Sequence, residues 1–360
     1  MKMVNIKHIE VPGYKQVIEA TDPAVGLHCF IAVHDVTLGP ALGGMRIHPY
    51  AKSEDALNDA LRLAKAMTYK SAVAETSLGG GKSVMIANPK DKTPALLAAF
   101  AKVVDYLKGE YIVAEDVGST PEDMAIIRQS TPFVAALPSD KSSGDPSRFT
   151  AWGVFKGIQA VAHKLWNTTC LRKKTIAIQG LGSVGSKLAN ILFWEGVDRI
   201  LCDVNKDKLH QHCLLYGAKA IESAEYTSIP CDILAPCAMG GIITESVVPH
   251  LHCKAIAGAA NNQLLTPHVG QLLMDRKILY APDYIINSGG IINASAEFDP
   301  EGYNPVVTRD RVNHIYDILL QVFDKSDLEK LPTSIIADEI AEYKLKHGVN
   351  KRQIPIIFKN

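Results

Sequence analysis

The 360-residue sequence lacks several features that would place it in a specialised class of protein. No stretch approaches the roughly 18–20 uncharged apolar residues that span a bilayer. Lysine plus arginine equal aspartate plus glutamate at 38 each, so no excess of charge favours nucleic acid or an acidic membrane as a partner. No internal repeat or low-complexity tract is present. A small charged metabolite remains a possible ligand, because its site needs only a few local charges.

Cysteine and histidine patterns are also sparse. The seven cysteines form no C-x-x-C pair, which disfavours a disulfide scaffold or a zinc ribbon and favours buried, reduced thiols in a cytosolic protein. No H-E-x-x-H pattern occurs, so we interpret His48, His163 and His268 as surface or packing residues and expect no metal site. Residues 1–10 hold no apolar run flanked by basic residues, so the pattern predicts no secretory signal and a cytoplasmic location.

The chain length suggests two domains. The strand and helix patterns described below predict the α/β class for both. A first domain is expected over residues 1–140 and a second over 141–330, and residues 331–360 could fold back onto either of them. The polar segment Pro138–Phe149 is interpreted as the crossing between them. In the first domain, strands are expected at 26–33 and 83–87, and helices at 52–70 and 94–107.

Strands alternate with helices in the second half of the chain. A long helical pattern runs from Thr150 to about Trp166, and another covers about 334–347. Between them, strands are expected at 175–179, at 199–203 and near Ile233 and Ala255, with helices from 184 and at 206–216. This rhythm indicates a parallel sheet that is covered on both faces.

A glycine motif follows the apolar strand at 175–179. Gly180 permits a tight turn, Gly182 lets the backbone approach a pyrophosphate, and Gly185 allows close helix–strand packing. Asp203 ends the next strand and offers its carboxylate to the adenosine ribose, which favours NAD over NADP. The motif predicts a Rossmann-type, doubly wound domain. We expect the cofactor to contact Gly180, Leu181, Gly182, Ser183, Val184, Gly185 and Asp203.

An ordinary strand–turn–helix without a ligand is the alternative to this cofactor site. The motif alone also leaves the choice between a nicotinamide and a flavin open.

Two lysines of the first domain stand in unusual contexts. Lys70 ends an amphipathic helix, and Lys82 follows three glycines just before an apolar run. A phosphate-binding loop is one interpretation, but Thr76 occupies the position where its first glycine belongs. A cleft is the other: one lysine binds a carboxylate, the second acts as a base beside it, and Asp116 moves protons. Solvated surface lysines are a third possibility.

Taken together, these segments resemble the Glu/Leu/Phe/Val dehydrogenase family, and within it the leucine dehydrogenases. The resemblance covers nearly the whole chain. The matching runs are 37–44 (TLGPALGG), Arg46, 59–64 (DALRLA), 67–70 (MTYK), 78–82 (LGGGK), 114–118 (AEDVG), 180–182 (GLG), 231–233 (CDI), 235–238 (APCA), 262–264 (NQL) and 280–287 (YAPDYIIN).

The resemblance implies the NAD-dependent oxidative deamination of an L-amino acid to a 2-oxo acid and ammonia. It implies that Lys70 binds the substrate carboxylate beside Gly43 and Gly44, with Lys82 as general base and Asp116 as proton carrier. Thr150 and Asn262 are implied near the nicotinamide or the substrate. It also implies that the last residues return to the first domain, and that the chain forms a homo-oligomer, an octamer among leucine dehydrogenases.

The resemblance implies a side-chain pocket without charge, which favours an aliphatic, branched-chain substrate over glutamate. Its residues are Leu42, Met67, Ala114, Ile291 and Ala294. Leucine is the expected substrate, with phenylalanine, tryptophan and valine as alternatives. The chain departs from the leucine dehydrogenase pattern at Glu75-Thr76-Ser77, where Glu75 is either a solvated charge or alters the cleft. A catalytically idle NAD-binding protein is the rival interpretation.

Overall fold

The computed structural model describes residues 4–137 and 142–358, and these form two compact units. The first unit comprises Met1–Asp145, Ala294–Pro305 and Ala341–Asn360, and the second comprises Pro146–Asn293 and Val306–Ile340. Residues 138–141 of the expected crossing segment lie outside the described part of the chain. The helix expected from Thr150 begins earlier, at Ser147. Within the described ranges, no helix is both long and apolar enough to cross a membrane.

A six-stranded mixed sheet forms the centre of the first unit, in the order β1-β2-β3-β5-β4-β6. Its strands are β1 (Asn5–His8), β2 (Gln16–Asp22), β3 (Leu27–Asp35), β4 (Ala41–His48), β5 (Gly79–Ile86) and β6 (Tyr111–Glu115). β1, β2, β3 and β5 pair antiparallel, whereas β4 runs parallel to both β5 and β6.

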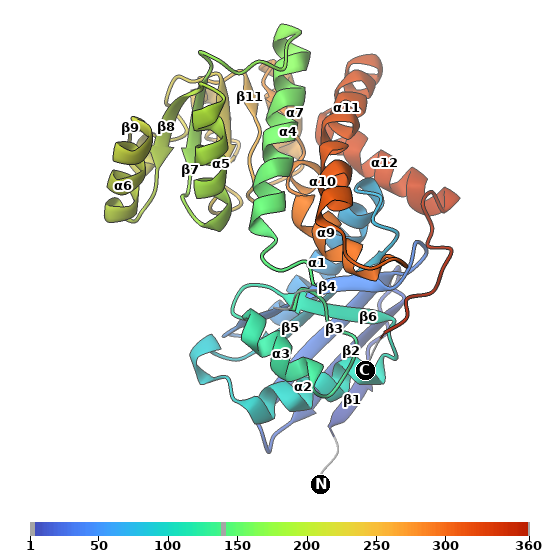
Figure 1. Ribbon diagram of the computed structural model, residues 1–360. Helices are drawn as coiled ribbons and strands as arrows, with labels where there is room; N and C mark the ends of the chain where they lie inside the picture. The colour runs from blue at the N-terminus through green and yellow to red at the C-terminus, as the bar shows by residue number, and fades with distance from the viewer. Residues whose placement is uncertain (1–3, 138–141, 359–360) are drawn as a thin grey trace. The chain divides into compact units, whose positions relative to one another are not determined.

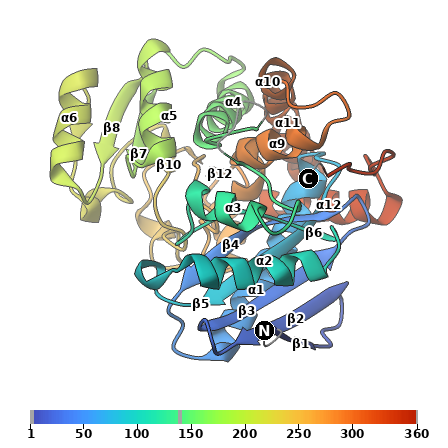
Figure 2. The same ribbon diagram turned by 60° about the horizontal axis from the view of Figure 1, so that its bottom comes forward.

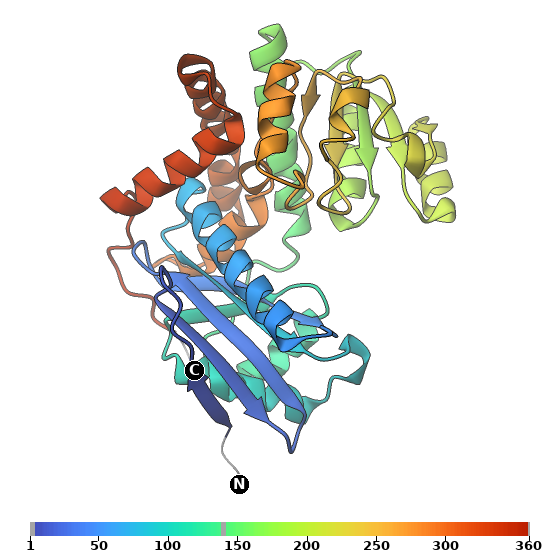
Figure 3. The same cartoon turned by 180° about the vertical axis from the view of Figure 1, so that it is seen from behind.

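The two faces of this sheet carry different helices. α1 (Ser53–Val73) lies across one face (Figure 3). Val84 of β5 packs among the small alanines of this helix. α2 (Pro94–Tyr106) and α3 (Pro121–Arg128) lie on the opposite face (Figure 2). Pro94 stands at the first position of α2 and the Thr93 side chain caps it, as expected where a missing N–H costs nothing.

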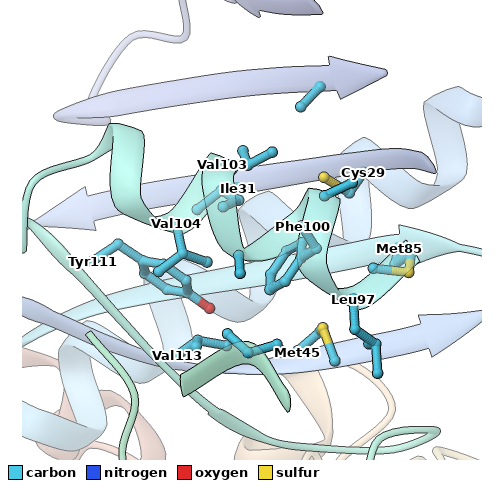
Figure 4. Packing of buried hydrophobic residues seen from close by; sticks show 14 of the residues in the cluster. Cys29, Ile31, Met45, Met85, Leu97, Phe100, Val103, Val104, Tyr111 and Val113 are labelled. Carbon is cyan, nitrogen blue, oxygen red and sulfur yellow. The ribbon is translucent and has the colours of Figure 1, made fainter. Parts of the chain in front are cut away.

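The main core of the first unit lies between the sheet and α2. Phe100 projects from α2 toward Met45, Met85 and Tyr111 of three different strands, and all four are fully buried (Figure 4). Side chains alternate along each strand, so odd-numbered residues of β4, β5 and β6 supply this core. The even-numbered residues of the same strands therefore face the α1 side.

The three glycines before Lys82 lie within strand β5, which begins at Gly79 and not at residue 83 as the sequence pattern predicts. Each one lies where a side chain has no room. A Cβ at Gly79 would lie 2.1 Å from the Asp35 carbonyl, and one at Gly80 would lie 2.0 Å from the Thr68 backbone nitrogen of α1. The glycines allow close approach of α1 and neighbouring strands, so the phosphate-loop interpretation is wrong.

The second unit contains a six-stranded sheet whose described pairs are all parallel, in the order β12-β11-β10-β7-β8-β9 (Figure 1). Its strands are β7 (Thr175–Gln179), β8 (Asp198–Cys202), β9 (Lys219–Ala220), β10 (Ile233–Pro236), β11 (Ala255–Ile256) and β12 (Leu279–Tyr280). This is the 3-2-1-4-5-6 order of dinucleotide-binding folds, whose strand order reverses between β7 and β10. The predicted doubly wound class is confirmed.

Helices complete the two units. They are α4 (Ser147–Trp166), α5 (Ser183–Trp194), α6 (Lys206–Tyr216), α7 (His268–Asp275), α8 (Asp283–Ile286), α9 (Gly289–Ser295), α10 (Pro305–Asn313), α11 (Ile315–Glu329) and α12 (Thr333–His347). Single 3-10 turns occur at Pro89–Asp91, Ser223–Glu225, Val248–His250 and Ala296–Phe298. All seven cysteines are free thiols, but Cys170 is exposed, contrary to the expectation of general burial.

The unusual segment after α1 is bonded to residues near the C-terminus of the chain. Glu75 has a φ of 56° and accepts a hydrogen bond of 2.7 Å from Lys344 Nζ. Arg352 donates from its backbone to Leu38 O, from Nε to Ser77 O and from Nη1 to Phe298 O. Glu75 is therefore an ion-pair partner of α12.

We expect Arg352→Ala to lower the free energy of unfolding of the first unit by about 2 kcal/mol. The Arg352 guanidinium donates to two carbonyls from different segments. A buried charged hydrogen bond is worth about 1.5–3 kcal/mol, and the partial exposure of Arg352 reduces the sum for the two bonds. Urea denaturation followed by circular dichroism measures the change, with Lys351→Ala at the exposed neighbouring position as control. Equal midpoints for the two variants would contradict this role.

Candidate active site

Six residues of neighbouring strands share the α1 face of the first-unit sheet. Strand pairing aligns Leu42 with Gly80 and Gly44 with Ala114, so alternate positions of β4, β5 and β6 lie side by side. They are Leu42, Gly44, Arg46, Lys82, Ala114 and Asp116. Three of the six are charged, which is unusual for a sheet face inside a folded unit.

Lys82 and Asp116 form a buried ion pair. Lys82 Nζ lies 2.7 Å from Asp116 Oδ2, and the exposed fractions of the two side chains are 6% and 23%. Burial lowers the pKa of Lys82, although the Asp116 carboxylate opposes that shift. Burial alone would raise the pKa of Asp116, but Lys82 and Arg46 hold it below its ordinary value. A buried lysine whose ammonium is disfavoured is suited to act as a base.

Three further polar residues extend this pair, and the sequence analysis assigned none of them a role. Arg46 lies between Asp116 and Asp59 of α1, at 3.1 Å from Asp116 Oδ2 and 2.9 Å from Asp59 Oδ2. Tyr50 donates a hydrogen bond of 2.6 Å to the same oxygen of Asp59. The alternation Leu42–Gly44–Arg46 indicates that these three side chains share one face of a strand. It points to a contact between Arg46 and the Lys82–Asp116 pair only once β4 is known to neighbour β5 and β6.

The glycines expected at the carboxylate end of the cleft are buried, and neither has room for a side chain. A Cβ at Gly43 would lie 1.9 Å from Gly81 O, and one at Gly44 would lie 2.7 Å from the Asp116 Cβ. The Tyr111 hydroxyl donates to Gly43 O at 2.8 Å from the opposite face of the sheet. The β4 backbone beside Asp116 therefore carries no side chains at these two positions, and the Tyr111 hydrogen bond helps to fix it in place.

The other first-unit candidates lie on α1 and the same sheet face. Lys70 stands half-buried in the last turn of α1, the helix that covers the side of the sheet to which Lys82 belongs. Met67, one turn earlier, is also half-buried. Leu42 is 2% exposed, and Ala114 is half-buried.

The glycine motif of the second unit forms a turn between β7 and α5. Gly180 has a φ of 88°, a left-handed conformation that favours glycine. A Cβ at Gly185 would lie 1.9 Å from Gly180 O, whereas a Cβ at Gly182 would meet nothing within 4 Å. Gly182 caps α5, so the free N–H groups of Ser183 and Val184 belong to the first turn of this helix. A bare helix start of this kind suits a pyrophosphate.

Asp203 ties the glycine turn to the end of β8. Its Oδ2 accepts a hydrogen bond of 2.6 Å from Leu181 N, and its Oδ1 accepts one of 2.8 Å from Asn205 N. A carboxylate oxygen has further lone pairs for a ribose hydroxyl. Asp203 therefore has a structural role that the sequence analysis did not foresee, beside its expected contact with the cofactor.

A strained loop of the second unit carries Asn262. Its φ is 52°, and its side chain is exposed. The buried Gln263 holds the loop by donating to Gly258 O and Ala260 O, while Asn287 donates to Asn261 Oδ1 at 2.6 Å. Strain maintained by surrounding hydrogen bonds is common at ligand sites.

The remaining candidates lie on α4 and α9. Thr150 is near the start of α4, where its hydroxyl donates to Pro146 O and a Cβ at Gly290 would lie 2.9 Å from it. Ile291 and Ala294 of α9 are 7% and 8% exposed.

We expect Gly182→Ala and Gly185→Ala to separate cofactor binding from folding. The Gly182→Ala methyl meets open space, so this variant should keep its melting temperature. The same methyl would hinder the approach of a pyrophosphate to the backbone, so the KM for the dinucleotide should rise about tenfold. The Gly185→Ala methyl overlaps Gly180 O, so this variant should lose stability. Differential scanning calorimetry and initial rates at varied dinucleotide concentration test the pair. An unchanged KM for the dinucleotide in Gly182→Ala would contradict the expectation that this turn binds the pyrophosphate.

Comparison with known proteins decides the family. The model described as Glu/Leu/Phe/Val dehydrogenase, dimerisation domain, matches residues 14–133, and the Glutamate/Leucine/Phenylalanine/Valine dehydrogenase model matches 198–326. A leucine dehydrogenase of Geobacillus stearothermophilus is 44% identical over 342 residues, 94% of this chain and 93% of that one. This chain belongs to the Glu/Leu/Phe/Val dehydrogenase family. The family consists of amino-acid dehydrogenases, oxidoreductases that act on a CH–NH₂ group.

Relatives with other substrates in their names are similarly close within this family. A phenylalanine dehydrogenase of Caldalkalibacillus thermarum is 40% identical over 351 residues, covering 96% of this chain and 94% of that one. The crystal structure of L-tryptophan dehydrogenase from Nostoc punctiforme has a TM-score of 0.82 at 40% identity, covering 93% of this chain and 97% of that chain. The predicted family resemblance is confirmed.

Proposed function

We propose that this amino-acid dehydrogenase catalyses the NAD-dependent, reversible oxidative deamination of an aliphatic L-amino acid, with leucine preferred. The products are the 2-oxo acid and ammonia. The observation that carries the proposal is the buried Lys82–Asp116 pair on the α1 face of the sheet. A solvated surface lysine needs no such burial, and a lysine that serves only as a charge has no need of a lowered pKa.

We assign the carboxylate contacts of the substrate, and most of its side-chain contacts, to the first unit. Lys70 holds the substrate carboxylate, and Gly43 and Gly44 present bare backbone to that end of the ligand. We assign Leu42, Met67, Ala114 and Ala294 of the first unit, and Ile291 of the second, to recognition of the amino acid's side chain. No charged group belongs to this pocket set, which favours an apolar side chain over that of glutamate.

We assign NAD to the second unit. The open backbone at Gly182 and the start of α5 fit a pyrophosphate, with Gly180, Leu181, Ser183, Val184 and Gly185 forming the turn. The Asp203 carboxylate fits ribose hydroxyls and disfavours a 2′-phosphate, which supports NAD over NADP. Thr150 and Asn262 contact the nicotinamide end or the substrate. NAD, when bound, accepts the hydride that the amino acid releases from Cα.

The residues of the chain then hold and move protons. Loss of a hydride from Cα, and of a proton from the amino group to Asp116, converts the amino acid into an imino acid. Lys82 in its neutral form then takes a proton from the water that attacks this imine. Asp116 accepts hydrogen bonds from the amino group and passes protons to and from Lys82. Collapse of the carbinolamine releases ammonia and the 2-oxo acid.

Initial rates of NADH formation with a panel of L-amino acids test the proposal. We expect leucine, isoleucine and valine to give the highest kcat/KM with NAD, and NADP to be poorly used. Silence across the panel with both dinucleotides would refute the enzyme assignment and support an idle NAD-binding protein. A higher kcat/KM for phenylalanine or tryptophan would favour the second candidate function, a dehydrogenase of aromatic amino acids. The similarity to a phenylalanine dehydrogenase and an L-tryptophan dehydrogenase, each 40% identical, supports this alternative.

We further propose a cytoplasmic homo-oligomer, and an octamer specifically. The match of residues 14–133 to a dimerisation-domain model supports self-association. Sedimentation velocity of the purified protein gives the subunit number, and a monomer at micromolar concentration would refute this.

A further inference from the structure

Arg46 occupies a position that the proposed reaction does not yet use. It projects from β4 on the same sheet face as Lys82, and its exposed fraction is 23%. Its Nε donates to Asp116 Oδ2 at 3.1 Å, the oxygen that also accepts the hydrogen bond from Lys82. Its Nη1 donates to Asp59 Oδ2 at 2.9 Å. A half-buried guanidinium thus connects the ion pair to helix α1.

The contact between Arg46 and Asp59 is held in place by further hydrogen bonds to Asp59. Tyr50 donates to Asp59 Oδ2 at 2.6 Å, and Arg62 donates to Asp59 Oδ1 at 2.8 Å. Asp59 thereby accepts hydrogen bonds from three side chains, and burial combined with these bonds leaves its pKa below the ordinary value. Because Asp59 is fixed and ionised, it fixes the guanidinium of Arg46 in turn.

We propose that Arg46 is a positioning residue for the proposed reaction: it orients the Asp116 carboxylate toward Lys82 and keeps a second positive charge beside it. This inference rests on the proposed function, because it deepens the role of the Lys82–Asp116 pair. The planar guanidinium suits the task, since its Nε and Nη1 point in fixed directions toward two separate carboxylates. The ammonium group of a lysine does not offer two donor atoms that point in fixed directions.

The charges around Lys82 show what Arg46 does. Asp116 follows β6, Arg46 belongs to β4 and Asp59 to α1, so the charged groups come from three elements that surround β5. Burial disfavours the ammonium of Lys82 most, Asp116 and Asp59 favour it, and Arg46 disfavours it. Arg46 also competes with Lys82 for the same oxygen of Asp116. It therefore helps Lys82 to release its proton without removing the carboxylate that receives protons.

The pH dependence of kcat/KM for leucine tests this role in Arg46→Met and Arg46→Lys. Activity rises with pH as Lys82 loses its proton, and losing the Arg46 charge raises the pKa of Lys82. The acidic limb of Arg46→Met should therefore move to higher pH by about one unit, with an approximately tenfold loss near neutral pH. Arg46→Lys keeps the charge, so its limb should move less. A uniform loss at every pH, without a shift, would overturn the inference.

Arg62→Met is the matched control, because Arg62 pairs with the same Asp59 but is 56% exposed and has no described bond to Asp116. Its pH profile should match that of the unmodified protein. An equal shift in Arg62→Met would show that the helix contact, and not Arg46, is responsible.

A second measurement does not depend on turnover. Labelling of Lys82 by acetic anhydride at a series of pH values, read by peptide mass spectrometry, gives the apparent pKa of its amine. That pKa should rise in Arg46→Met, and an unchanged value would overturn the inference. If no amino acid is oxidised but the labelling midpoint still moves, the proposed function fails while the role of Arg46 toward Lys82 stands. Should Arg46→Met fail to fold, Arg46→Gln replaces it in both measurements.

Discussion

Lys82→Ala is expected to lower kcat/KM for leucine by about 10³-fold while the dissociation constant for NAD stays within twofold. The amine of Lys82 is buried against Asp116 in the first unit, whereas the glycine turn proposed for NAD belongs to the second. Loss of the base should therefore leave the cofactor site unchanged. Initial rates and a fluorescence titration with NADH measure the two quantities separately.

Lys82→Arg distinguishes a base from a fixed charge. Arginine keeps the positive charge beside Asp116 but does not deprotonate in proteins, so this variant should be nearly as inactive as Lys82→Ala. Lys90→Ala, at an exposed position soon after the same strand, is the surface control and should keep full activity. If Lys82→Arg retained more than a tenth of the activity, Lys82 would be a charge and not the base.

Gly80→Ala is expected to destabilise the first unit by about 3 kcal/mol or more. Its new methyl would lie 2.0 Å from the Thr68 nitrogen and 2.4 Å from the Thr68 Cα. Backbone atoms of a 21-residue helix cannot move aside as a flexible side chain can, so α1 would have to separate from β5. Soluble yield and the midpoint of urea unfolding measure the effect.

Gly182→Ala is the matched control for adding one methyl to a glycine, since that methyl meets nothing within 4 Å. It should unfold within about 0.5 kcal/mol of the unmodified protein. A Gly80→Ala protein that was equally stable would show that α1 does not need this close contact, and the explanation of the triple glycine would fail.

Some elements could be predicted from local sequence, and others depend on neighbours far along the chain. The boundaries expected at 175–179 and 206–216 agree with β7 and α6, because an apolar run and the helix-capping Asn205 are local signals. The sequence pattern predicts a start for strand β5 that is too late, because glycine disfavours strands and only close packing against Thr68 explains Gly80.

The candidate site divides in the same way. The motifs around Lys82 and Asp116 predict their roles, and the structure brings their charged groups within 2.7 Å. Arg46 and Asp59 also belong to runs that match the family, but these runs predict no role for either residue. Their pairing depends on β4 neighbouring β5 and on α1 crossing the same face, which no local pattern of residues encodes.

The stoichiometry of one complete reaction with [2-²H]-L-leucine and NAD tests the central claim most directly. Our account predicts equal amounts of NADH, 2-oxo acid and ammonium, with the deuterium recovered at C4 of the nicotinamide ring. It also predicts that none of the three forms with Lys82→Ala on the same timescale. Release of NADH without ammonium, or of NADH without deuterium, would contradict oxidative deamination by hydride transfer from Cα.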